Sequence, residues 1–222
     1  LKNIDRTILE YSPSDGYLSL RTEMVKYYAE YGIYLSPDEI IITAGGSEAV
    51  LFAFLACLDP GDEIIVTDPF YANYMAFAIS VGAVIKSVKT HIENGFRLPS
   101  VEEFEAKITD RTRAILICNP NNPTGALMSE QMLREIVEIA RSADAWILCN
   151  EVYRHLSQED GWCPSIVDLY EKGISVSSMS KVFSLAGLRL GWIATHDITV
   201  FDSTGMALLD LAVADFLLKK NR

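Results

Sequence analysis

The chain of 222 residues is poor in the side chains that build disulfides and metal sites. It has four cysteines and three histidines, and no two cysteines form a CxxC pair. Three of the cysteines stand at the ends of apolar runs, where a thiol packs as a small hydrophobic group. We therefore expect free, buried thiols in a reducing, cytoplasmic compartment, and we hold a disulfide or a metal site as the alternative.

Basic residues and long apolar runs are also scarce. The 19 lysines and arginines face 30 acidic residues, which gives a net charge of −11 and argues against nucleic acid or an anionic membrane as a partner. The longest apolar run, over residues 49–58, is too short to span a bilayer, and the first residues show no signal-peptide pattern. With half of its residues hydrophobic, the chain has the composition of a globular protein, which excludes a disordered or disulfide-scaffold class.

Strand-like and helix-like segments alternate along most of the chain. Short apolar runs predict strands, and amphipathic or apolar segments that follow turn residues predict helices between them. The predicted strands are residues 40–43, 63–67, 83–88, 113–118, 145–150, 173–177 and 191–195, and the predicted helices include 19–31, 46–58, 69–81 and 129–141. This order indicates an α/β fold with a mostly parallel or mixed sheet and helices on both faces. We assign residues 1–195 to one large domain and residues 196–222 to the start or remnant of a C-terminal segment.

Chemistry-bearing residues gather where these strands end, which is where ligands bind in such sheets. Lys181 follows a strand, and its amine can form an imine with an aldehyde. Ser178 and Ser180 beside it can donate to a phosphate, and Arg189 can bind the same group with two parallel hydrogen bonds. A surface lysine in a serine-rich loop is the alternative, but it leaves the Gly-x-Arg-x-Gly spacing unexplained. The segment therefore predicts a phosphorylated aromatic ring above a lysine.

These motifs, in order, resemble the pyridoxal-phosphate enzymes of fold type I, in particular the class I/II aminotransferases, over about residues 11–195. The resemblance implies that Lys181 carries the Schiff base with the cofactor and later moves the substrate's α-proton. It implies that Ser178 and Arg189 hold the phosphate. In the segment Asn-Pro-Thr-Gly at 122–125, Asn122 matches the residue that bonds the ring hydroxyl, and Tyr153 matches a second contact to that oxygen.

Three further segments match the same family. Gly45, Gly46 and Ser47 resemble its phosphate loop, in which backbone N–H groups at the start of a helix point at an anion. Tyr71 matches the aromatic residue that stacks on the pyridine ring, with a core tyrosine as the alternative. Tyr11 matches a tyrosine that reaches the phosphate of the neighbouring subunit, which implies a homodimer. The alternative is that Tyr11 packs near the start of the first helix.

The chain departs from the family at one charged position. The family places an aspartate against the pyridine nitrogen, and this chain has Asn150 there. An opposite charge in contact shifts a pKa by about 1–3 units, and the amide lacks that effect. Glu151 is a poor substitute because neighbouring residues on a strand point to opposite faces. We therefore expect cofactor binding to survive better than turnover.

The chain also differs from the family in length. The resemblance implies a C-terminal small domain with an arginine for the substrate α-carboxylate. The residues after Thr195 are too few to build that domain, and Arg222 could be the beginning of it.

The resemblance implies a pyridoxal-phosphate-dependent transfer of an amino group between an amino acid and a 2-oxo acid. Two alternatives use the same cofactor site. One is a carbon–sulfur lyase that carries out α,β-elimination. The other is a catalytically impaired, aminotransferase-like binding protein, which Asn150 and the missing small domain favour.

Overall fold

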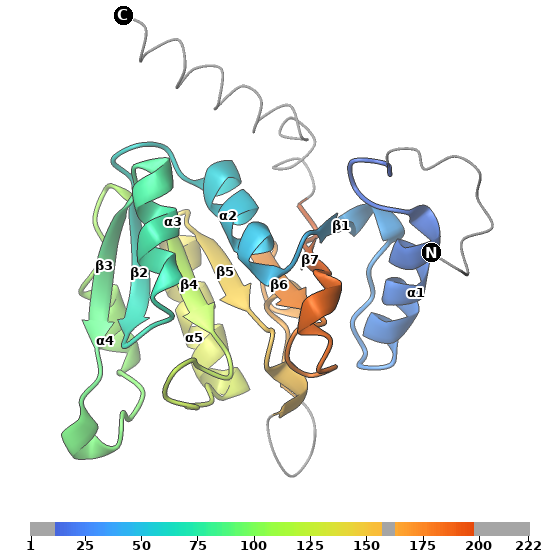
Figure 1. Ribbon diagram of the computed structural model, residues 1–222. Helices are drawn as coiled ribbons and strands as arrows, with labels where there is room; N and C mark the ends of the chain where they lie inside the picture. The colour runs from blue at the N-terminus through green and yellow to red at the C-terminus, as the bar shows by residue number, and fades with distance from the viewer. Residues whose placement is uncertain (1–11, 157–162, 198–222) are drawn as a thin grey trace, which may run out of the picture.

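The computed structural model describes residues 12–156 and 163–197 and is built around one sheet (Figure 1). Within these residues the sheet has seven strands in the order β1-β7-β6-β5-β4-β2-β3. The strands are β1 (Ile40–Thr43), β2 (Glu63–Asp68), β3 (Val84–Lys89), β4 (Thr112–Cys118), β5 (Trp146–Asn150), β6 (Gly173–Ser178) and β7 (Gly191–Ala194). The neighbours from β3 to β6 are parallel, whereas β7 runs antiparallel to both β1 and β6. The predicted mixed sheet is confirmed.

Helices cover both faces of this sheet, as predicted. The α-helices are α1 (Leu18–Ala29), α2 (Gly46–Cys57), α3 (Asn73–Val81), α4 (Val101–Glu105) and α5 (Glu130–Ser142), and the 3-10 helices are η1 (Pro37–Glu39), η2 (Ile92–Asn94), η3 (Arg154–Leu156), η4 (Ile166–Asp168) and η5 (Ala186–Leu188). Side chains of β5 alternate between two cores. Ile147 and Cys149 pack with α1, α4 and α5, whereas Leu148 packs with α2 and α3.

One helix begins later than the sequence pattern predicts. We expected a helix from residue 69, but α3 begins at Asn73. The backbone N–H of Tyr74 bonds to the carbonyl of Tyr71, and that of Met75 bonds to the carbonyl of Ala72. These are tight-turn bonds to the third residue back rather than α-helical bonds to the fourth. The residues before Asn73 therefore form a loop from the end of β2, and this loop brings Tyr71 to the edge of the sheet.

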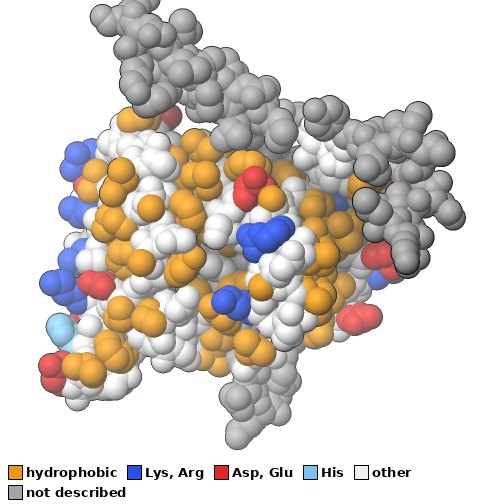
Figure 2. All heavy atoms as spheres, viewed as in Figure 1, with side chains coloured by type: hydrophobic (Ala, Val, Ile, Leu, Met, Phe, Trp, Pro, Cys, Tyr) orange, Lys and Arg blue, Asp and Glu red, His pale blue; other side chains and the backbone are white. Residues whose placement is uncertain are grey.

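Basic side chains line one edge of the sheet. The edge strand β3 carries Lys86 and the exposed Lys89, and Figure 2 shows Lys and Arg side chains along this left-hand border. Charges on an edge strand discourage pairing with a strand of another chain. We therefore read this basic border as protection of the sheet edge.

The four cysteines are free thiols, as predicted. Cys118, Cys149 and Cys163 are buried, whereas Cys57 is half-buried. Burial raises the pKa of the Cys118 thiol to about 11 and that of the Cys163 thiol to about 12, so both are protonated at neutral pH.

Across the described ranges, no helix is long and apolar enough to cross a membrane.

Candidate active site

A pocket of about 240 Å³ lies at the carboxyl ends of the parallel strands. It brings together most of the residues that the sequence singled out, from five separate segments of the chain. The lining residues are Gly46, Ser47, Val50, Tyr71, Phe77, Asn122, Asn150, Val152, Tyr153, Ser178, Ser180, Lys181, Ala186 and Arg189. Of the other predicted residues, Gly45 lies immediately before the lining residue Gly46, and Tyr11 lies outside the described residues.

The lysine of this pocket follows the end of β6. Lys181 is exposed, and its Nζ lies 6.0 Å from the centre of the Tyr153 ring. Ser178, the last residue of β6, is buried, and its Oγ accepts a hydrogen bond of 3.3 Å from the backbone N–H of Ser180. The hydroxyls and the amine therefore open into one space, where a phosphate and an aldehyde of the same molecule can be bound.

Positive charge and N–H donors meet at the start of α2. The helix begins at Gly46, so the N–H groups of its first turn have no partner within the helix and are available to an anion. The guanidinium of Arg189 is held at this end by two backbone carbonyls, at 3.0 Å from that of Ala186 and 3.2 Å from that of Ala44. A Cβ at Gly45 would overlap this guanidinium. Glycine at position 45 is what lets the arginine reach the helix end.

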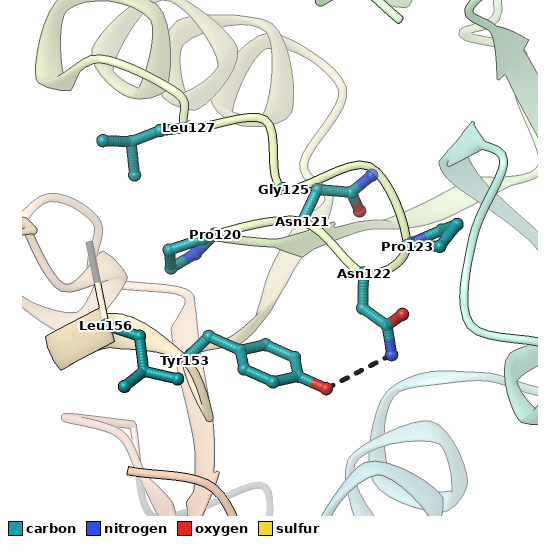
Figure 3. Close-up of a pocket in the computed structure, with 8 residues that line it drawn as sticks. All are labelled: Pro120, Asn121, Asn122, Pro123, Gly125, Leu127, Tyr153 and Leu156. Atoms are coloured by element: carbon teal, nitrogen blue, oxygen red, sulfur yellow. Dashed lines mark hydrogen bonds between the residues drawn. The ribbon is translucent and has the colours of Figure 1, made fainter. Parts of the chain in front are cut away.

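The opposite wall of the pocket is a pair of polar side chains. The Nδ2 of Asn122 donates to the Tyr153 hydroxyl at 3.3 Å (Figure 3). Asn122 and Tyr153 also border a second hollow of about 440 Å³ with a largely apolar lining, which Figure 3 shows. Burial raises the pKa of the Tyr153 hydroxyl. The hydroxyl is protonated at neutral pH and can donate to an oxygen in the first pocket while it accepts from Asn122.

Tyr71 lies on the pocket wall and is fixed from two sides. Its hydroxyl accepts a hydrogen bond of 2.7 Å from the Nδ2 of Asn73, and its ring meets that of Tyr74 edge-on at 5.5 Å. The ring is half-buried and lines the pocket. A flat ligand can therefore lie against it, and stacking on a pyridine ring stays a prediction.

Asn150 and Glu151 point in different directions, as predicted. Asn150, the last residue of β5, lines the pocket. Glu151 is only 3% exposed. Its carboxylate accepts hydrogen bonds of 2.8 Å from the Ser165 hydroxyl and from the Ile166 backbone N–H, on the other side of the loop. Glu151 is therefore unable to stand in for a carboxylate at position 150.

The sequence analysis did not predict three further side chains at the pocket, those of Tyr74, Val50 and Phe77. Tyr74 is buried and accepts a hydrogen bond of 2.8 Å from the Nδ2 of Asn150, although it belongs to the same Pro-Phe-Tyr-Ala-Asn-Tyr run that pointed to Tyr71. Val50 and Phe77 supply apolar wall. The spacing of Val50 four residues into the predicted helix could have placed it on the face above the pocket, whereas nothing in the sequence indicates the contact between Tyr74 and Asn150.

The donor set fits a phosphorylated pyridine aldehyde. Helix N–H groups, serine hydroxyls and Arg189 suit a phosphate, and Lys181 suits an aldehyde. Asn122 and Tyr153 suit a ring hydroxyl. These groups occupy one pocket at the strand ends of a mixed α/β sheet, which defines the class: a pyridoxal-phosphate-binding protein of fold type I.

Comparison with known proteins gives the family. Residues 2–219 match the family "Aminotransferase class I and II", and the chain belongs to this pyridoxal-phosphate-dependent family. It is 34% identical over 200 residues to the putative aminotransferase YugH of Bacillus subtilis, a match that covers 88% of this chain and 52% of the relative. The chain thus spans about half the length of the curated relatives it matches.

Solved structures agree with this assignment. The aspartate aminotransferase of Thermotoga maritima superposes with a TM-score of 0.81 at 32% identity, over 87% of this chain and 52% of that one. A PLP-dependent aminotransferase from Streptococcus suis superposes with a TM-score of 0.78 at 37% identity, over 88% of this chain and 50% of that one.

Proposed function

We propose that this protein transfers an amino group between an amino acid and a 2-oxo acid, with pyridoxal phosphate bound in the pocket at the strand ends. The observation that carries the proposal is that Lys181 shares one pocket with Arg189, the α2 N-terminus and the Asn122–Tyr153 pair. When bound, pyridoxal phosphate supplies an aldehyde that attaches amines and a ring that withdraws electrons from the substrate's α-carbon.

Each residue of the pocket has a role in this proposal. Arg189 and Ser178 hold the phosphate, and Asn122 and Tyr153 orient the ring through its hydroxyl. Lys181 would hold the aldehyde end of the cofactor through its Nζ. The same amine would carry the proton away from the substrate's α-carbon. One lysine therefore both holds the cofactor and moves the proton.

Trapping of the lysine tests the proposal. Borohydride reduction in the presence of pyridoxal phosphate should fix the cofactor to the peptide that contains Lys181, as read by mass spectrometry. Lys172 is the matched control, because it lies next to the N-terminal end of β6 and bonds to Asp144 there. Lys172→Ala should keep the label and Lys181→Ala should lose it. Label on any other lysine in the unsubstituted protein would overturn the assignment.

The catalytically impaired alternative rests on one observation, the neutral Asn150 in the pocket lining. A single-turnover half-reaction with a panel of amino acids separates it from the leading proposal, because an impaired protein binds the cofactor and leaves it unconverted. The carbon–sulfur lyase alternative predicts release of pyruvate and ammonia from cystathionine without a keto acid.

We further propose that the protein is a cytoplasmic homodimer. The four free thiols support the reducing compartment, and Tyr11 supports shared sites through its match to the family pattern. Sedimentation equilibrium should give twice the chain mass. Tyr11→Phe should weaken cofactor binding and leave that mass unchanged.

A further inference from the structure

Asn150 is held in one orientation by the backbone beside it. Its Oδ1 accepts a hydrogen bond of 3.2 Å from the N–H of Val152. A backbone N–H is only a donor, so the group that faces it must be the amide oxygen. The amide nitrogen therefore faces the other way, toward Tyr74.

The amide nitrogen of Asn150 is held by the phenol of Tyr74. Nδ2 donates to the Tyr74 hydroxyl at 2.8 Å. An amide nitrogen is only a donor, so the phenol oxygen is the acceptor in this bond. Flipping the amide would set Nδ2 against the N–H of Val152, donor against donor.

The charged groups around Asn150 also disfavour a positive charge in the pocket. Among the described residues that line the pocket there is no aspartate or glutamate, and the charged ones, Lys181 and Arg189, are both cations. Tyr71 and Tyr153 on the pocket wall and Tyr74 behind it are the phenols of the site, and burial raises the pKa of Tyr74 well above its ordinary value. The nearest carboxylate in sequence, Glu151, is bonded to Ser165 away from the pocket. No described residue that lines the pocket offers a negative charge to a pyridinium.

We propose that Asn150 holds the ring nitrogen of pyridoxal phosphate as a hydrogen-bond acceptor, unprotonated at neutral pH, with Tyr74 as the positioning residue that fixes the donor. Nδ2 carries two hydrogens, and the bond to Tyr74 uses one of them. The second is the donor to the ring. This inference rests on the proposed function, because it requires that pyridoxal phosphate is the ligand of the pocket.

Nitrogen NMR of the bound cofactor tests the inference without any turnover. The full-length protein is loaded with pyridoxal phosphate carrying ¹⁵N in the ring, and the resonance is compared with those of the free base and the protonated pyridine. We expect the free-base position in the unsubstituted protein and an upfield shift to the protonated position in Asn150→Asp. A protonated nitrogen in the unsubstituted protein, or an unprotonated one in the Asp variant, would overturn the role given to Asn150.

Tyr74→Phe tests the positioning role. Loss of the fixed donor should weaken the hydrogen bond to the ring, so the resonance should move further downfield while the nitrogen stays unprotonated. Tyr170→Phe is the matched control, because Tyr170 is also buried but donates to the Ala145 carbonyl in the other core. Equal shifts in the two variants would overturn the role of Tyr74. If absorbance shows no bound cofactor in the unsubstituted protein, the proposed function fails and this inference fails with it.

Discussion

At the scale of single residues, Arg189 shows how a pocket can hold a charge in position before its ligand arrives. Its backbone lies in the left-handed region, at φ 52°, and its guanidinium is bonded to the carbonyls of Ala186 and Ala44. Both bonds orient the planar fork beside the α2 N-terminus. The side chain is exposed, so the hydrogen bonds to these carbonyls, and not burial, hold it at the helix end.

Replacing Arg189 should weaken cofactor binding. A hydrogen bond to a charged group contributes about 1.5–3 kcal/mol, so Arg189→Ala should lower the affinity for pyridoxal phosphate by roughly tenfold to a hundredfold. Arg189→Lys should restore only part of it, since the two-donor fork is lost. Titration of the cofactor-free protein, followed by absorbance, measures both. Arg134→Ala on the surface of α5 is the control, and unchanged affinity in Arg189→Ala would place the phosphate elsewhere.

Glu63 makes the stability of the fold depend on pH. The side chain is 1% exposed, and it accepts hydrogen bonds of 2.7 Å from Thr109 and from Arg111. The hydrogen bond from Thr109, with help from Lys86 and Arg111, lowers the pKa of the carboxyl below its ordinary value of 4.5. A lowered folded-state pKa gives stability that is present above the unfolded-state value and is lost as the pH falls through the folded-state value.

Glu63→Gln should therefore remove an acid-sensitive contribution. We expect the free energy of unfolding at pH 7 to fall by about 1.5–3 kcal/mol, the value of hydrogen bonds to a charged group. We also expect the free energy of unfolding of the Gln variant to fall less steeply than that of the unsubstituted protein as the pH drops below about 4.5. Urea unfolding at a series of pH values measures both effects. The exposed Glu93 is the control, and a Glu63→Gln curve parallel to that of Glu93→Gln would contradict the prediction.

The sequence predicted the polar residues that line the pocket but not the buried contact between Asn150 and Tyr74. Lys181, Arg189 and Asn122 lie in short motifs whose spacing reflects local turns, so the sequence carries their positions. The contact between Asn150 and Tyr74 joins residues 76 positions apart, and it depends on how α3 packs against β5. Local patterns contain no information on such a contact.

At the scale of elements, the start of α2 and the start of β7 are packed backbone against backbone. A Cβ added at Gly191 would lie 2.6 Å from the backbone nitrogen of Gly46. No side chain fits between them. The glycine therefore sets the distance between the N-terminus of α2 and the strand that follows Arg189.

Gly191→Ala should push these two elements apart. Overpacking of this kind costs about 1–3 kcal/mol of stability, and it should also weaken cofactor binding because the α2 N-terminus and Arg189 move relative to each other. Gly187→Ala is the matched control, since a Cβ there meets nothing within 4 Å. Thermal unfolding and cofactor titration measure the two effects. Equal behaviour of the two variants would show that the contact can relax without consequence.

Strands were predicted more closely than helix starts. The predicted strands at 40–43 and 145–150 are short, apolar and bounded by turns, and the observed strands coincide with them almost residue for residue. The start of α3 was misplaced because Pro69 is a common first residue of a helix. The tertiary position of Tyr71 instead keeps the next residues in a loop.

At the scale of the whole molecule, the sequence indicated the layers but not the order of the strands. Alternating strands and helices require helices on both faces of a parallel sheet, and this is observed. The insertion of β7 between β1 and β6 depends on a contact between the two ends of the described chain. The buried bond of 2.8 Å from the Trp192 indole to the Tyr28 hydroxyl belongs to the same contact, and no local pattern predicts it.

The strand order also has a consequence for the protein during its synthesis. β1 lies at the edge of the sheet with β7 as its neighbour, and Thr43 pairs with Gly191, which is 191 − 43 = 148 residues later. A ribosome adds about 5–20 residues per second, so roughly 7–30 s pass before the partner of β1 exists. Through that interval the nascent chain carries an unpaired strand and the apolar face of α1. Among the described strands, β1 is therefore synthesised first and gains its neighbour last.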